Sequence, residues 1–336
     1  MKNKINLQLM YLFNIIFFTF GLSLTSYSSL LINKVSYISW LIPIITIPIS
    51  ILLFCFLPNN KNTIIKLKNN MIFKFVIVCY NLLSTIFLTY YTIKILTNWF
   101  YTNTNILIFI FFFSAIYLIG LIKINTIIRA GFIWSILFLF ILITLIFIQN
   151  DLELSFIKPI IINNNILSCL FYLTLPLDNI LYLLINTNTD NIPTKKNMTK
   201  GIIISLLIAS LHLFLSLTIV NYRFYELLET PSINIFFMFY TKNYIGHYDI
   251  ALIILLLITY FYKSSLYSNI SLQFFDKKTK PLICLIFSIL SFCFLKILVF
   301  NHDYINKVKW MLFCLIMLIY LFIVFYRKEN SIEKHN

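Results

Sequence analysis

Apolar residues fall in ten long runs that short polar stretches separate. Most runs are near the roughly 20 residues that a helix needs to cross a bilayer, and none alternates as the strands of a membrane barrel do. The pattern predicts an all-α integral membrane protein with ten transmembrane helices. The runs cover residues 7–31, 36–57, 71–97, 106–122, 131–149, 166–186, 201–221, 249–271, 281–300 and 308–326.

The composition favours the same class of protein. Of the 336 residues, 60% are hydrophobic and 11% are charged, whereas soluble domains carry about 25% charged residues. The first run is too long for a signal peptide and has no small-residue cleavage site. All six cysteines lie in apolar runs without a CxxC pair, so we interpret them as small buried apolar residues rather than disulfides or metal ligands. Residues 1–336 are expected to form a single membrane domain.

The charge distribution predicts the orientation. The formal net charge of +15 would also suit a nucleic acid or an anionic surface, but the excess of Lys and Arg in cytoplasmic loops explains it. An even number of crossings with both termini in the cytoplasm places most basic residues inside and most acids outside. The basic residues assigned to the outer side are Lys34, Lys94, Lys158, Arg223, Lys242, Lys307 and Lys309.

The sixth run contains a proline and an acid near its middle, in the stretch Leu173–Asn179. Pro176 removes a backbone donor and clashes with the carbonyl four residues before it, which predicts a break in the helix. Asp178 is an ionisable group at membrane depth, where charge is costly and usually functional. Many secondary transporters build a binding site at such a break. The corresponding site here would lie at Thr174, Leu175 and Pro176, with Asp178 beside them. The alternative is a kinked structural helix with Asp178 at a water-filled interface.

The first run carries many hydroxyls around its only glycine, Gly21, in the stretch Phe20–Ser28. Such a stretch can unwind, and the freed amides of Gly21, Leu22, Ser23 and Thr25 could then hold an anionic group. The alternative is a helix-packing face of small residues. Together with the break at Pro176, the stretch predicts broken first and sixth helices.

The eighth run places Thr259 and Lys263 four residues apart, on one helix face. Lys263 lies far from both ends of the run, so an internal ammonium that faces the bundle is expected, and Asp178 is a candidate partner. The alternative is a lysine that reaches the cytoplasmic interface.

Other polar groups in the runs are expected to be structural. Asn14 and Asn81 are interpreted as hydrogen bonders between helices. His212 is a lone histidine without a second catalytic group, so a hydrogen-bonded structural role is favoured over an acyltransferase. The longest stretch between runs, Tyr222–Tyr248, predicts a short helix over the outer mouth of the bundle or an interfacial loop.

The chain resembles the GerAB-type endospore germination permeases of the amino acid–polyamine–organocation superfamily. Gly21 and Trp40 fall at the separation that the family shows, while Ser23 replaces its second glycine and Ser28 its proline. The break and acid at Pro176–Asp178 are similar to those of the family. The most specific similarity is the stretch from Thr230 to Asp249 and on to Ser265, in which His247 stands where the family usually has an arginine.

The resemblance implies a LeuT-like fold of two inverted five-helix repeats, about 7–149 and 166–326. It also implies the nutrient-recognising B-type subunit of a germinant receptor in the spore inner membrane of a bacterium. Implied partners are a small-molecule nutrient such as an amino acid, a larger membrane subunit and a lipoprotein subunit. No cofactor and no enzymatic activity are expected.

The implied mechanism is binding of a zwitterionic nutrient. Its carboxylate would meet the amides of Gly21–Thr25, and its amine the carbonyls of Thr174–Pro176 with Asp178 near. Thr259 and Lys263 would tie the eighth helix to the first, where relatives of this fold hold a sodium ion. Two alternatives are an amino acid permease with the same site and a membrane-embedded acyltransferase that uses His212.

Overall fold

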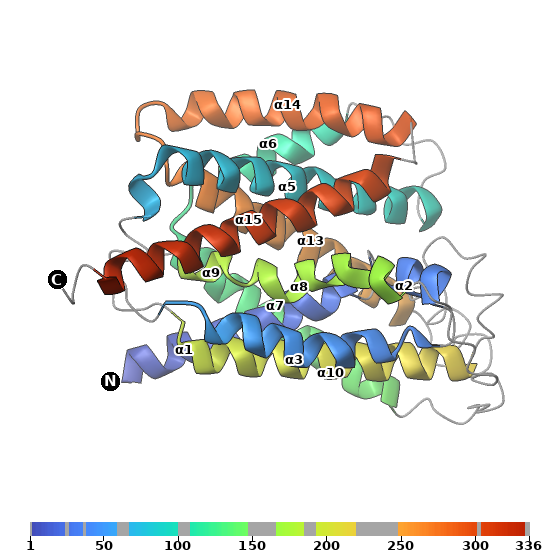
Figure 1. Cartoon of the computed structure of the whole chain (residues 1–336). Coiled ribbons are helices and arrows are strands. Elements are labelled where there is room, and N and C mark those ends of the chain that lie inside the picture. The colour runs from blue at the N-terminus through green and yellow to red at the C-terminus, as the bar shows by residue number, and fades with distance from the viewer. Residues whose placement is uncertain are drawn as a thin grey trace.

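The structure is a computed structural model and describes residues 2–23, 27–35, 38–58, 67–99, 108–146, 166–184, 193–219, 248–300 and 304–332. These residues form a bundle of helices (Figure 1), and none of them lies in a strand. The helices are α1 (Lys2–Leu22), α2 (Ser28–Val35), α3 (Leu41–Cys55), α5 (Met71–Trp99), α6 (Ile108–Gly120), α7 (Ile124–Ile146), the 3₁₀ helix η4 (Ile166–Leu173), α8 (Thr174–Asp178), α9 (Leu181–Leu184), α10 (Lys195–Ile219), α13 (Tyr248–Leu272), α14 (Lys280–Phe300) and α15 (Tyr304–Ile332).

Five of these helices are long and apolar enough to cross a membrane, namely Met71–Thr97, Lys195–Thr218, Ile253–Leu272, Lys280–Val299 and Tyr304–Tyr326. Helices α6 and α7 meet at a bend of 115° and make a sixth span if they are counted as one. The expected first, second and sixth runs appear as shorter apolar helices. The described residues therefore support a helical membrane protein, and ten crossings remain a prediction.

Regular α-helix ends at both predicted breaks, and Ser23 and Tyr27 at the first of them are π-helical. Helix α1 ends at Leu22 and α2 begins at Ser28, although the apolar run is continuous. The sixth run starts as a 3₁₀ helix, changes to α-helix at Thr174 and is interrupted again after Asp178. Proline explains the second case, because Pro176 cannot donate to the carbonyl of Tyr172.

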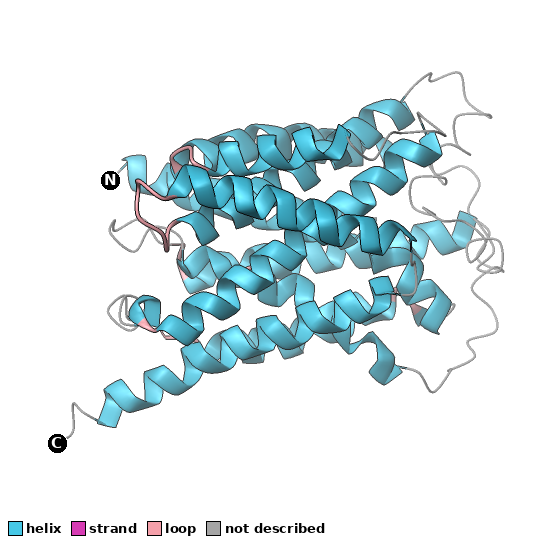
Figure 2. Ribbon diagram, turned by 90° about the horizontal axis from the view of Figure 1, so that it is seen from above, coloured by secondary structure: helices cyan, strands magenta, loops and turns pink. Residues whose placement is uncertain are grey.

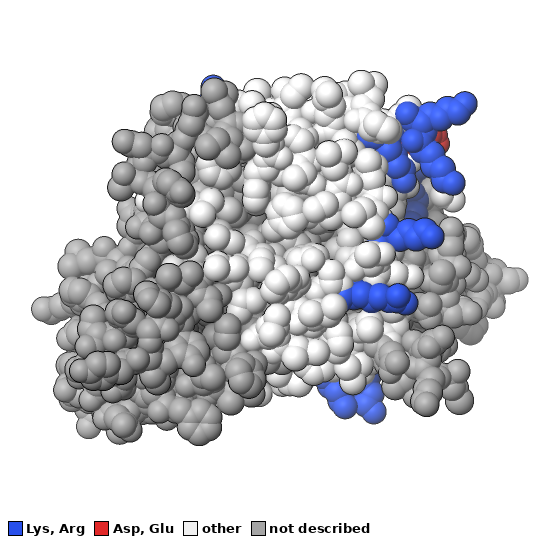
Figure 3. Space-filling model, turned by 180° about the vertical axis from the view of Figure 1, so that it is seen from behind, with Lys and Arg blue, Asp and Glu red and all other residues white. Residues whose placement is uncertain are grey.

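The outer surface of the bundle is apolar. Along α14 large side chains point away from the protein, with Leu282 62% exposed, Leu285 58% and Ile289 52%. Figure 3 shows an uncharged surface over most of the described part, with most Lys and Arg in view at one end. A monomeric soluble protein rarely exposes so large an apolar patch. A lipid environment explains this surface.

Helix α13 occupies the interior and packs against α5, α6 and α7. Helix α1 packs against α7 and α10, α3 against α10, α14 against α5 and α6, and α15 against α5 and α8. The start of α1 and the end of α15 lie at the same end of the bundle, on the left in Figure 1. The view from above in Figure 2 shows the same set of helices side by side. We call the end that holds the start of α1 the terminal end.

Several boundary predictions were wrong. Lys309 was assigned to the outer loop, but it is 2% exposed inside α15. Helix α7 begins at Ile124 rather than at residue 131, so Arg129 is helical. Three of the six cysteines, Cys55, Cys293 and Cys314, are exposed on the outer surface rather than buried. The predicted cap at Tyr222–Tyr248 lies outside the described residues, apart from Tyr248 itself.

Candidate functional site

The centre of the site is a buried ion pair between Asp178 and Lys263. The Lys263 ammonium lies 2.5 Å from Oδ2 of Asp178, and the two side chains are 2% and 4% exposed. The hydroxyl of Tyr80 in α5 donates to Oδ1 of the same carboxylate at 2.8 Å. The candidate pairing of Asp178 with Lys263 is thereby confirmed, and the alternative in which Lys263 reaches the interface is wrong.

The break in the sixth run positions this carboxylate. Asp178 is the last residue of α8, and Asn179 follows it in a turn. The Asn179 amide donates to Thr19 Oγ1 at 3.1 Å and to the carbonyls of Leu175 and Pro176 at 3.2 Å each. The bond to Thr19 fastens the C-terminal end of α8 to α1, and the other two cap the end of α8 itself. The hydroxyl of Thr174 bonds to the carbonyl of Phe171 at 2.5 Å.

Aromatic rings surround the Lys263 ammonium. Its nitrogen lies 5.3 Å from the centroids of Phe18 and Tyr267 and 5.4 Å from that of Tyr182. Desolvation of a buried ion pair is costly, and ring faces attract cations most strongly where water is excluded. The three rings and the carboxylate therefore stabilise the ammonium together.

The first run meets the same centre where α1 ends. A Cβ atom on Gly21 would lie 3.0 Å from Cγ2 of Thr259, so α1 and α13 approach closely there. The hydroxyl of Ser23 bonds to that of Tyr172 at 2.7 Å, which joins the two interrupted segments directly. Thr25, a predicted ligand contact, lies outside the described residues. The predicted site residues on both segments and on α13 are thus brought together.

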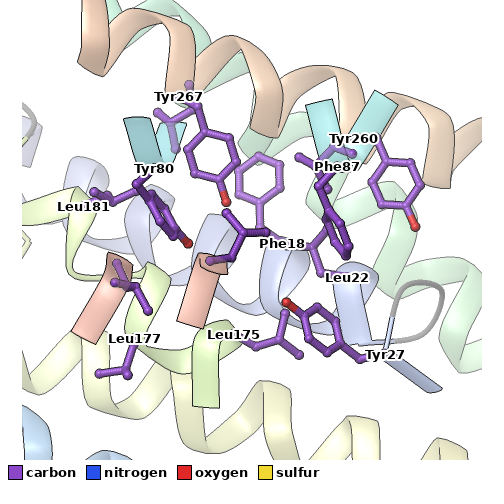
Figure 4. Packing of buried hydrophobic residues seen from close by; sticks show 14 of the residues in the cluster. Phe18, Leu22, Tyr27, Tyr80, Phe87, Leu175, Leu177, Leu181, Tyr260 and Tyr267 are labelled. Atoms are coloured by element: carbon purple, nitrogen blue, oxygen red, sulfur yellow. The ribbon is translucent and has the colours of Figure 1, made fainter. Parts of the chain in front are cut away.

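A small cavity lies beside the carboxylate. Its volume is about 20 Å³, which is room for one water molecule. Figure 4 shows Tyr80 and Tyr267 on one side of this cluster and Tyr27 with Phe87 on the other. The predicted contacts Leu22, Thr174, Leu175 and Asp178 line the cavity, together with Tyr27, Tyr80, Ser84, Phe87, Leu88, Tyr267 and Leu312. An amino acid does not fit in this conformation unless the lining moves.

A second buried lysine, Lys309 of α15, lies beyond the side of the cavity that Tyr27 and Phe87 form. The Lys309 ammonium is 5.5 Å from the centroid of Tyr27, 5.6 Å from Phe87 and 5.4 Å from Tyr91. Tyr27 itself stacks on Phe171 with the ring planes 22° apart. Sequence reasoning found neither Lys309 nor the tyrosines. Lys309 lies near the end of its run, and a tyrosine in an aromatic-rich run has no distinguishing spacing.

The remaining polar predictions are structural. Asn14 donates to the carbonyl of Ile128 at 2.9 Å and Asn81 to the hydroxyl of Ser271 at 3.0 Å, which confirms both as hydrogen bonders between helices. His212 has Ser216 at 3.5 Å and the Phe20 ring at 6.2 Å. Within the described ranges, no three His, Cys, Asp or Glu residues are grouped as metal ligands would be.

Comparison with known proteins adds no assignment. No protein-family model matches the chain, and no curated protein sequence matches it. The geometry around Asp178 therefore carries the functional argument.

Proposed function

We propose that the chain binds a small zwitterionic nutrient, an amino acid or a similar molecule, beside Asp178. We further propose that it is the B-type subunit of a spore germinant receptor, in the spore inner membrane, and that it signals to a larger membrane subunit and a lipoprotein subunit. The observation that carries the proposal is the meeting of two interrupted membrane segments at a buried carboxylate beside a cavity. Broken helices with polar groups at their breaks are how many membrane carriers bind solutes.

The proposed fold is a LeuT-like pair of inverted five-helix repeats with both termini cytoplasmic. Helix packing supports this fold when each of the ten predicted segments is matched with the one five places later in the chain. In chain order the segments are α1–α2, α3, α5, α6, α7, η4–α9, α10, α13, α14 and α15. The pair α1–α10 then corresponds to η4–α3, α1–α7 to α8–α15, α6–α13 to α14–α5, and α5–α15 to α13–α7, and all these pairs pack. The pairs α5–α13, α3–α10 and α6–α14 map onto themselves. An odd number of crossings in each repeat would invert the second relative to the first.

The contacts of the two broken segments follow the same relation. Gly21 of the first segment lies against Thr259 of α13, and Asp178 of the sixth accepts a hydrogen bond from Tyr80 of α5. Helices α13 and α5 exchange places under the shift by five. This correspondence supports a shared architecture for the two halves of the site.

The size of the cavity gives the proposal a signalling mechanism. A nutrient cannot enter about 20 Å³, so binding must favour a more open arrangement of Tyr27, Phe87 and the two broken segments. A ligand shifts such an equilibrium only by its difference in affinity for the two states. The partner subunit would detect the resulting movement of α1 and α8.

The first test is binding by the purified chain. Isothermal titration with a panel of amino acids should detect binding to the unaltered chain. The variants Asp178→Ala and Gly21→Leu should abolish that binding. The exposed acid Asp276 gives a matched control, since Asp276→Ala should bind as the unaltered chain does. Equal affinity in Asp178→Ala and the control would overturn the site.

The second test separates the receptor from other uses of the site. Spores that lack the gene should lose germination with at least one amino acid or sugar and keep it with others. A normal response to every nutrient would remove the receptor proposal while leaving the binding site intact.

An amino acid permease is the second candidate. A buried acid and lysine beside a cavity are also typical of transporters that move ions or protons with their substrate. Uptake of a labelled amino acid into vesicles that contain the chain alone would favour this candidate.

A further inference from the structure

A row of polar side chains on α13 leads from the ion pair toward the terminal end. Lys263, Tyr267 and Ser271 follow one another at intervals of four residues and therefore share one helix face. All three are buried, with exposed fractions of 2%, 3% and 2%. An apolar face would be expected inside a membrane bundle, since buried polar groups are costly without partners.

Helix α5 provides the facing side chains. The rings of Tyr80 and Tyr267 meet edge to face at 6.1 Å, and both side chains interact with the Asp178 carboxylate. One turn further along α13, toward the terminal end, Ser271 Oγ accepts a hydrogen bond from the Asn81 amide of α5 at 3.0 Å. Two successive turns of this α13 face, at Tyr267 and Ser271, thus contact the adjacent residues Tyr80 and Asn81 of α5.

A further group of polar contacts reaches the surface. Gln273 follows the end of α13 and donates to Asn269 Oδ1 at 3.0 Å, and Lys68 donates to Gln273 Oε1 at 3.5 Å. Asn269 also donates to the carbonyls of Gly120 and Ile122. Gln273 is exposed and Lys68 is half-buried, so this separate group of contacts reaches solvent two residues beyond Ser271.

Two buried oxygens have no hydrogen-bond partner among the residues that the structure describes, namely Asn81 Oδ1 on this row and Ser268 Oγ on the adjoining face of α13, which meets Gly120 of α6. Each is in a side chain that is 1% exposed. Buried polar atoms are generally satisfied by protein or by ordered water, and buried waters typically link two to four such groups. The unsatisfied Asn81 oxygen therefore marks a position on the row where water would complete the chain of contacts.

We propose that this row between α5 and α13 conducts protons between the Asp178–Lys263 pair and the terminal end of the bundle. In one turnover the carboxylate takes up a proton from the cavity side and becomes a neutral acid while Lys263 stays an ammonium. It then releases a proton through the hydroxyl of Tyr267 and water held at Asn81 and Ser271, which regenerates the ion pair. One proton crosses the site, and no bond other than O–H bonds changes.

The groups that face the pair are compatible with this role. The charged and titratable side chains that act on Asp178 come from α13, α5, α9 and the break after α1, and they are Lys263, Tyr267, Tyr80, Tyr182 and Tyr27. At the surface end, burial lowers the pKa of Lys68 to about 8. An amine with a pKa of about 8 exchanges protons with water readily near neutral pH.

Proton flux in vesicles tests the inference. The unaltered chain is reconstituted with a pH-sensitive dye inside, and a potassium gradient with valinomycin drives protons inward, with and without a mixture of amino acids outside. We expect flux above that of protein-free vesicles. Asn81→Leu should lower it about tenfold, since the change removes a buried polar link that no neighbouring side chain replaces.

The bundle offers a matched control. Asn14 is also a buried asparagine with a bond to a neighbouring helix and, within the described residues, an unpartnered oxygen, but it lies on α1, away from the row. Asn14→Leu should keep the flux that Asn81→Leu loses. The milder pair Ser271→Ala and Ser205→Ala repeats the comparison, because Ser205 is equally buried and bonds within α10.

The proposed function requires only that a nutrient binds, so the two proposals fail separately. Asn81→Leu should bind amino acids as the unaltered chain does. Absence of flux in the unaltered chain, or equal flux in Asn81→Leu and Asn14→Leu, would overturn proton conduction. Loss of binding in Asp178→Ala protein that thermal unfolding shows to be folded would still support the nutrient site in either case.

Discussion

Gly21 in α1 lies so close to Thr259 in α13 that a Cβ atom at position 21 would be 3.0 Å from Thr259 Cγ2. This is tighter than ordinary van der Waals contact, and it occurs one residue before α1 ends. A glycine at this position lets the interrupted first segment reach the helix that carries Lys263.

Substitution of Gly21 should lower the stability of the fold, and a second substitution at Thr259 should restore it. Gly21→Ala should destabilise the fold by about 1–3 kcal/mol, the usual cost of overpacking, and should weaken nutrient binding. Thr259→Ser removes the methyl group and keeps the hydroxyl that bonds to the carbonyl of Leu255. The double variant should therefore recover stability, measured by thermal unfolding in detergent. If the double variant is no more stable than Gly21→Ala alone, the close contact with Thr259 is not the reason that position 21 requires glycine.

The Asp178–Lys263 pair should be more costly to break than to replace. Asp178→Leu or Lys263→Met alone leaves one buried charge without its partner, which typically costs about 3–5 kcal/mol. The combination Asp178→Leu with Lys263→Met removes both charges and should regain most of that loss. Denaturant titration of the four proteins in detergent gives the interaction energy. Additive losses would mean that the two charges do not stabilise one another.

The sequence predicted the interrupted segments because each has a local cause. Pro176 removes a donor, and Gly21 stands in a dense group of hydroxyls. Asp178 and Lys263 were suspected because an ionisable group in an apolar run is too costly to be incidental. Sequence could suggest their contact without establishing it, since no local pattern says which distant helices meet.

The rest of the site depends on tertiary packing. Tyr80 and Tyr172 are ordinary aromatic residues in apolar runs until the fold places their hydroxyls on Asp178 and Ser23. Lys309 was misplaced because hydropathy alone does not show which residues near a helix end are covered. The cavity's small volume depends on side-chain packing that no sequence pattern encodes.

The bond between Ser23 and Tyr172 should act as a link between the two broken segments. Ser23→Ala and Tyr172→Phe each remove one partner of a buried hydrogen bond and should cost about 1 kcal/mol. If both act through the same 2.7 Å contact, the double variant should lose less than the sum of the two. Thermal unfolding of the two single variants and the double variant measures this. Fully additive losses would place the two effects in separate contacts.

Lys68 should make stability depend on pH in the alkaline range. Burial lowers its pKa from the ordinary 10.5 to about 8, so between these values the unfolded chain binds the proton and the folded chain does not. Stability therefore rises as the pH increases from about 8 to 10.5 and gains nothing more from this group above that range. Below pH 8 both states are protonated, and the buried ammonium imposes a constant cost.

Lys68→Met should remove this dependence. Its unfolding midpoint in detergent should exceed that of the unaltered chain at pH 7, and the difference should shrink as the pH approaches 10. Lys278→Met replaces an exposed lysine and should leave the profile unchanged, which separates the effect from the general response to losing a positive charge. A difference between Lys68→Met and the unaltered chain that stays constant from pH 7 to 10 would contradict the lowered pKa of Lys68.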